Sequence, residues 1–215
     1  MCIRDSRYPD PLCRALRRAI AAEEEVEEEM VLCGCGAADL IWRAVWARRP
    51  RRALVLAPTF SEYESALRAA GCVVVHSALR RKAGFTAGEE LLDALTPELD
   101  MAFFCQPNNP TGRVLPPALL EAALARCAQA GIFAVVDECF LDFLDHAAAH
   151  SAKRYIATQF GLLVVKGIGF FSYTYQSAIR VLAMSGRDTF ADNRAAGILS
   201  QMKMCIRDRL LSGAI

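Results

Sequence analysis

The sequence of 215 residues predicts an α/β protein, organised as a three-layer α/β/α sandwich around a mainly parallel β-sheet. Two observations support this fold class. Apolar segments of strand length alternate along the chain with segments of helical periodicity, which is the order of βαβ units. The apolar segments also lack the alternation of polar and apolar residues that a sheet with one solvated face shows. We therefore expect helices to cover both faces of the sheet.

The clearest βαβ unit begins with the apolar strand 101–105. The loop 106–112 follows, and its two prolines and one glycine can neither continue a strand nor begin a helix. A helix at 116–131 opens with two prolines, which the first helical turn tolerates. The strand 132–136 then ends abruptly at Asp137. Polar residues thus follow both strands at their carboxyl ends, where open α/β sheets bind ligands.

The remaining elements are expected in the same alternating order. Apolar residues at spacings of three and four indicate helices, and short apolar runs between turn residues indicate strands. Residues 23–29 contain six acids around one valine and are interpreted as a solvated helix end or loop. We expect further helices at 12–22, 37–47, 62–70, 88–95 and 151–160, and further strands at 30–33, 53–57, 72–76 and 161–166.

Composition argues against several classes of function. Lys and Arg number 25 against 24 Asp and Glu, and no basic stripe suggests nucleic-acid binding. No apolar run is long enough to cross a membrane, and no secretory signal peptide follows Met1. Nine cysteines without CxxC spacing lie mostly inside apolar segments, which predicts reduced thiols in a cytoplasmic protein. Cys33 and Cys35 lack histidine partners, so a zinc site is rejected.

Three motifs carry a family resemblance: PNNPTG at 107–112, DECFLDF at 137–143 and CGCGAADLI at 33–41. Together they resemble the fold-type I enzymes that use pyridoxal 5'-phosphate (PLP), and within these the group of histidinol-phosphate aminotransferases. Phe140 stands where those aminotransferases usually have tyrosine, and in this it resembles the threonine-phosphate decarboxylases of cobalamin biosynthesis. The resemblance extends to about residue 166. It implies a PLP-transferase major domain at 7–190, without the family's carboxy-terminal small domain.

The resemblance also assigns cofactor-binding roles. Asp137 would keep the pyridine nitrogen protonated, because a neighbouring carboxylate favours the charged form of that ring. Asn109 would donate an amide hydrogen to the phenolate oxygen, and Phe60 would cover one face of the ring. Free backbone N–H groups at the start of a helix would bind the phosphate. These N–H groups would belong to Gly36, Ala37 and Ala38.

Each candidate residue also has a structural interpretation, which the sequence leaves open. Gly36 could serve only the turn into a helix, and Phe60 could be a hydrophobic staple beside Ser61 as N-cap. Asn109 could form an Asx-turn, and Asp137 could cap the next helix. The family usually has Asn-Gly where this chain has Cys-Gly.

The lysine that binds PLP covalently in the family has no counterpart here. Counting from the end of the strand 161–166 places Phe170 at the lysine position. Lys166 is assigned to the strand end and is expected to point elsewhere, so no catalytic residue is assigned. From Gly167 onward the resemblance stops, and Arg180 lies two residues beyond the family's arginine. A frameshift or a misjoined read near Lys166 would explain this, and genuine divergence after Lys166 remains the alternative.

The two ends of the chain share the five residues MCIRD, at 1–5 and 204–208. No structural repeat has this form. We interpret 1–6 and 204–215 as non-native ends, and expect the chain to be a fragment of a longer product.

The function implied by the resemblance is that of a PLP-dependent enzyme for an amino acid or an amino-acid phosphate, most like threonine-phosphate decarboxylase. Without the lysine, this fragment is expected to be inactive. A histidinol-phosphate-type aminotransferase and a non-catalytic PLP-binding or interaction fragment remain as alternatives. A nicotinamide-binding domain is rejected, because Asp39 holds the third glycine position of its fingerprint. The full-length family implies a homodimer.

Overall fold

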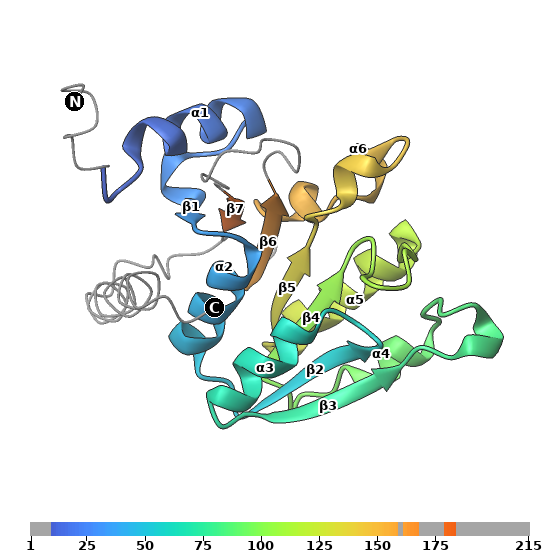
Figure 1. The fold of residues 1–215 in the computed structure, drawn as a ribbon. Helices are drawn as coiled ribbons and strands as arrows, with labels where there is room; N and C mark the ends of the chain where they lie inside the picture. Colours follow the sequence, from blue (N-terminus) through green and yellow to red (C-terminus); the bar gives the residue numbers. More distant parts are fainter. Residues whose placement is uncertain (1–9, 159–160, 168–178, 184–215) are drawn as a thin grey trace, which may run out of the picture.

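The computed structural model describes residues 10–158, 161–167 and 179–183. Their strands form one seven-stranded sheet in the order β1-β7-β6-β5-β4-β2-β3, which runs from the upper left to the bottom in Figure 1. Every neighbouring pair is parallel except the two that involve β7. The strands are β1 (Val31–Gly34), β2 (Arg52–Ala57), β3 (Val73–Ala78), β4 (Met101–Cys105), β5 (Phe133–Asp137), β6 (Leu162–Gly167) and β7 (Ile179–Ala183).

The helices connect these strands and cover both faces of the sheet (Figure 1). None of those in the described ranges is long and apolar enough to cross a membrane. The α-helices are α1 (Arg14–Glu24), α2 (Ala37–Arg48), α3 (Ser61–Ala69), α4 (Glu90–Ala94), α5 (Pro117–Ala130) and α6 (Ala147–His150). Short 3₁₀ turns occur at η2 (Glu28–Met30), η3 (Arg81–Ala83), η4 (Leu141–Phe143) and η5 (Ala152–Tyr155).

Two hydrophobic clusters, one on each face of the sheet, make the architecture three-layered. One cluster joins the sheet to α2 and α3, and the other joins it to α1, α4 and α5. In β5, Val135 belongs to the first cluster and Val136 to the second, because successive strand residues point to opposite faces. All five residues of β4 and of β5 are buried. The expected α/β class with a mainly parallel sheet is therefore confirmed.

The structure corrects two expectations about the charged and polar segments. Glu24 lies in the acidic run that was expected to be solvated, yet it is only 6% exposed. Its carboxylate forms ion pairs with Nζ of Lys166 at 3.3 Å and with Nζ of Lys153 at 3.2 Å, and these two cations offset the cost of burying it. The helix expected at 151–160 is also not formed. Ser151 instead caps the 3₁₀ turn η5, accepting the N–H of Lys153 on its side chain.

Candidate cofactor site

The carboxyl ends of the parallel strands define one edge of the sheet. β2, β4, β5 and β6 are mutually parallel, and β1 has the same direction because both it and β6 are antiparallel to β7. The loops after β1, β2, β4 and β5 therefore all leave from this edge. They carry the sequence-predicted residues: Gly36, Ala37 and Ala38 after β1, Phe60 after β2, Asn109 after β4, and Asp137 at the end of β5.

The turn from β1 into α2 requires glycine at two positions. Gly36 has φ 100° and ψ 159°, a region that residues with a side chain rarely occupy. A Cβ added at Gly34 would lie 2.5 Å from Cδ2 of Leu40. The structural interpretation of these glycines is therefore correct, and it is compatible with a phosphate-binding role. Among the described residues, the N–H groups of Ala37 and Ala38 have no recorded partner.

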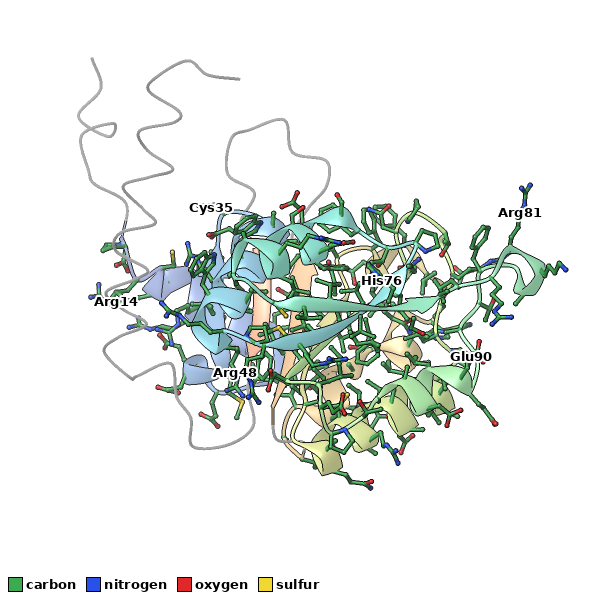
Figure 2. All side chains as sticks on the ribbon, turned by 90° about the horizontal axis from the view of Figure 1, so that it is seen from below. Arg14, Cys35, Arg48, His76, Arg81 and Glu90 are labelled. Carbon is green, nitrogen blue, oxygen red and sulfur yellow. The ribbon has the colours of Figure 1, made fainter. Side chains whose placement is uncertain are left out.

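The start of α2 is also fixed by a charge-neutral pair. Asp39 accepts the backbone N–H of Cys35 at 2.8 Å and pairs with Arg43 at 2.7 Å. The side chains of Asp39 and Arg43 are 5% and 10% exposed, so the pair is held rigidly. Because Arg43 balances the carboxylate of Asp39, the positive end of the α2 dipole keeps its attraction for an anion. Figure 2 labels Cys35 before this helix and Arg48 at its other end.

Asp137 is the buried carboxylate at this edge, with 5% of its surface exposed. It points to the face covered by α2 and α3, as Phe133 and Val135 do. Its Oδ2 accepts the hydroxyl of Tyr63 at 2.6 Å, and its Oδ1 accepts the backbone N–H of Cys139 at 3.0 Å. The bond to Cys139 closes a local turn, so the alternative that Asp137 caps an α-helix is wrong.

Tyr63 was missed by the sequence analysis. Its side chain is fully buried, stacks on Phe103 at 4.9 Å and meets Phe60 edge-on at 5.6 Å. Burial, followed by the neighbouring charge of Asp137, raises the pKa of Tyr63 well above its usual value. The hydroxyl therefore stays protonated and can donate. Its position three residues after Phe60, on the same side of α3, is the sequence signal that could have found it.

Phe60 occupies the N-cap position of α3, directly after β2. Ser61 is the first helical residue, and no side chain caps this helix, so the expectation of Ser61 as N-cap is wrong. Phe60 is half-buried beside the cluster of α2 and α3. Its ring thus retains an exposed part at the carboxyl edge of the sheet.

The loop after β4 is held by Asn108 rather than by Asn109. The Nδ2 of Asn108 donates to the carbonyl of Pro58 at 3.0 Å, and its Oδ1 accepts the hydroxyl of Thr59 at 2.8 Å. These bonds connect the loop after β4 to the loop that leads to Phe60. Asn109 forms a hydrogen bond through its backbone N–H, which donates to Sγ of Cys105 at 3.4 Å, and its side chain has no hydrogen bond to the described residues. Its carboxamide forms no Asx-turn and is free to meet a ligand.

Lys166 lies on the other face of the sheet. Lys166 stands two residues after Val164 in β6, so both side chains point to the face of α1, α4 and α5. The Nζ of Lys166 lies 3.3 Å from the carboxylate of Glu24. The expectation that Lys166 points away from the candidate site is confirmed. Phe170 lies outside the described residues, and of Arg180 the backbone alone is described.

Glu138, the neighbour of Asp137, also points away from the candidate site. It is 2% exposed and accepts the hydroxyl of Ser151 at 2.8 Å and the backbone N–H of Ala152. Burial raises the pKa of Glu138 to about 7, despite the opposing effect of these hydrogen bonds. Its role is to fasten the segment after β5 to the sheet.

A cavity of about 690 Å³ in the described ranges does not coincide with the candidate residues. It lies between α1, the segment 141–157 and Lys166. None of the six predicted cofactor-binding residues lines it. The candidate residues instead lie on the loops and at the strand end along the carboxyl edge of the sheet.

The fold and the edge residues together define a class of protein. This is an α/β domain with a glycine turn into a helix after β1, an amide loop after β4 and a buried carboxylate at the end of the adjacent strand β5. Residues 5–180 match the family described as Aminotransferase class I and II, and the chain belongs to this family. The resemblance found in the motifs is thereby confirmed, and the family is PLP-dependent.

Individual relatives agree with this assignment. The chain is 39% identical over 140 residues to a threonine-phosphate decarboxylase of Salmonella typhimurium, covering 65% of the chain and 38% of that protein. It is 34% identical over 151 residues to a histidinol-phosphate aminotransferase of Methanococcoides burtonii, covering 67% and 40%. The crystal structure of L-threonine-O-3-phosphate decarboxylase from Porphyromonas gingivalis has the same fold, with a TM-score of 0.70 and 23% sequence identity. The match covers 89% of this chain and 57% of that one. Of the two curated relatives, from Salmonella typhimurium and Methanococcoides burtonii, the chain spans about two fifths of the length.

Proposed function

We propose that the chain binds PLP at the carboxyl edge of its sheet, as the major domain of an enzyme most like threonine-phosphate decarboxylase. The proposed domain spans residues 7–190. The observation that carries the proposal is the buried carboxylate of Asp137, which ends β5 on the face of α2 and α3. The 39% identity to a threonine-phosphate decarboxylase supports the substrate class, an amino acid or an amino-acid phosphate.

The residues at the edge fit the chemical groups of PLP. Asp137 would hold the protonated pyridine nitrogen through a charge-assisted hydrogen bond. The carboxamide of Asn109 would donate to the phenolate oxygen, and Phe60 would shield one face of the ring from water. The amides of Gly36, Ala37 and Ala38 would bind the phosphate at the start of α2. When bound, the cofactor supplies an electron sink for charge that develops on a substrate.

Covalent attachment of the cofactor is not expected in this chain. The position assigned to the lysine holds Phe170, which has no amine. Lys166 is the nearest lysine in the sequence, and it pairs with Glu24 on the opposite face. We therefore propose noncovalent binding without turnover for the chain by itself.

A histidinol-phosphate-type aminotransferase is the second candidate for the enzyme lineage. Its support is the 34% identity to the Methanococcoides burtonii aminotransferase over 67% of the chain. Phe140 favours the decarboxylase, since the aminotransferases usually have tyrosine there. For either lineage we propose a cytoplasmic homodimer. The cytoplasmic location is supported by the free thiols of the cysteines in the described ranges.

A titration with PLP tests the proposal. Equilibrium dialysis of the purified chain should show saturable binding, and borohydride reduction should leave no adduct at residue 170 or at Lys166. Asp137→Asn should weaken PLP binding by ~10-fold or more, because the proposed charge-assisted hydrogen bond to the pyridine nitrogen is either lost or replaced by a weaker bond between neutral groups. The exposed Asp93→Asn on α4 is the matched control and should bind as the unmodified chain does. Absence of saturable binding by the unmodified chain would refute the proposal.

A further inference from the structure

We infer that Tyr63 is a positioning residue, which orients the carboxylate of Asp137 toward the ring nitrogen of PLP. This inference rests on the proposed cofactor binding. It concerns a residue that contacts Asp137 and Phe60, and that is too deeply buried in the described structure to contact a ligand at the edge itself.

Hydrogen bonds reach both oxygens of the Asp137 carboxylate. Tyr63 donates to Oδ2 at 2.6 Å, and the backbone N–H of Cys139 donates to Oδ1 at 3.0 Å. With one donor on each oxygen, the carboxylate cannot rotate without breaking a bond. The thiol of Cys139 also donates to this carboxylate. The two oxygens have four lone pairs between them, so one remains for a further donor. The protonated ring nitrogen of PLP is such a donor.

The donors to Asp137, from Tyr63 and from the backbone and thiol of Cys139, are all electrically neutral. Among the described residues, no ion pair to Asp137 is recorded, although it is only 5% exposed. The neighbouring buried acid of the site, Asp39, is instead neutralised by Arg43. A buried carboxylate without a cation is costly, and a cationic ligand would relieve that cost. Tyr63 therefore fixes the geometry of Asp137 while leaving its negative charge available.

The ring of Tyr63 is itself held in place. It stacks on Phe103 with an interplanar angle of 15° and meets the ring of Phe60 at 83°. Tyr63 thus connects the residue proposed to cover the cofactor with the residue proposed to bind its nitrogen. Replacing the tyrosine by phenylalanine keeps these ring contacts and removes only the hydroxyl.

A double-mutant cycle with PLP as the probe tests the inference. The dissociation constant for PLP is measured for the unmodified chain, Tyr63→Phe, Asp137→Asn and the double variant, with circular dichroism to verify folding. Tyr155→Phe is the matched control, since the hydroxyl of Tyr155 is buried without a partner in the described structure. Because Tyr63→Phe keeps the stacked ring, its fold is expected to persist, and binding is measured at low temperature to offset any loss of stability.

If Tyr63 acts through Asp137, Tyr63→Phe should weaken PLP binding by ~10-fold in the unmodified background, the effect of losing a hydrogen bond to a charged group. In the Asp137→Asn background the same change should have less than about a two-fold effect, because the charge that Tyr63 orients is already absent. Tyr155→Phe should leave binding unchanged.

Two results would overturn the inference while leaving the proposed function intact. One is PLP binding by Tyr63→Phe at the strength of the unmodified chain. The other is an equal weakening in both backgrounds, which would show that Tyr63 acts on the site without Asp137. Failure of the unmodified chain to bind PLP would overturn the inference and the proposed function together.

Discussion

Replacing Glu138 by glutamine should remove a specific pH dependence of stability. Burial raises the pKa of Glu138 from an ordinary value of 4.5 to about 7 in the folded chain. Between these two values the folded chain binds a proton that the unfolded chain has lost. The contribution of Glu138 to stability is therefore complete below pH 4.5 and is lost as the pH rises toward 7.

The size of the effect follows from the same two values. At about 1.36 kcal/mol for each pKa unit, the difference between 4.5 and about 7 corresponds to about 3 kcal/mol. The unmodified chain should therefore lose about 3 kcal/mol of unfolding free energy relative to Glu138→Gln between pH 4.5 and pH 8. Glutamine has nearly the same shape and can still accept the N–H of Ala152, so the fold is retained.

Urea unfolding at several pH values measures the difference directly. Each curve gives an unfolding free energy, and the difference between the unmodified chain and Glu138→Gln cancels the titration of all other groups. The exposed Glu121→Gln on α5 is the matched control and should show a difference that does not change with pH. A constant difference for Glu138→Gln as well would refute the account of its burial.

Three further predictions concern the glycine turn, the lysine position and the ends. Gly36→Ala should lower the unfolding free energy by about 1–3 kcal/mol, because alanine is strained at φ 100° and ψ 159°. Ala38→Gly should cost at most about 1 kcal/mol, and a smaller loss for Gly36→Ala than for Ala38→Gly in thermal unfolding would contradict this. Phe170→Lys should create a PLP adduct that borohydride traps and that mass spectrometry locates at residue 170. A trapped adduct at Lys166 in the unmodified chain would show that the lysine position has been assigned to the wrong residue. Removal of residues 1–6 and 204–215 should leave the melting temperature unchanged, and a clear decrease would show that these ends belong to the fold.

The sheet was predictable because its strands follow a simple physical rule. Strands β4 and β5 are buried on both faces, so their sequences are continuously apolar, and each ends where polar residues begin. The same rule predicted β1, β2 and β6 to within about two residues. Direction in the sheet followed from the order of strands and helices, which permits few connections other than parallel ones.

The segment after β5 was less predictable, because its structure depends on contacts distant in sequence. Asp137 and Glu138 are adjacent acids, yet they point to opposite faces of the sheet, one toward Tyr63 and the other toward Ser151. Local sequence does not reveal which acid is fastened to the fold and which faces the site. The same holds for Glu24, whose burial depends on Lys166, 142 residues away.

The candidate site was predicted from motifs, and the residues that organise it were not. The motif PNNPTG identified Asn109. The side chain that holds this loop in place is that of Asn108, which forms hydrogen bonds with Pro58 and Thr59. Tyr63 was overlooked because a buried aromatic residue in a helix usually serves the core alone. Only the three-dimensional arrangement shows that its hydroxyl meets Asp137.

The central claim is that this edge of the sheet binds PLP through Asp137. Equilibrium dialysis of PLP against the unmodified chain, Asp137→Asn and Asp93→Asn tests it most directly. The account predicts saturable binding to the unmodified chain and to Asp93→Asn, and binding at least ~10-fold weaker to Asp137→Asn. Equal binding by all three proteins, or saturable binding by none, would contradict it.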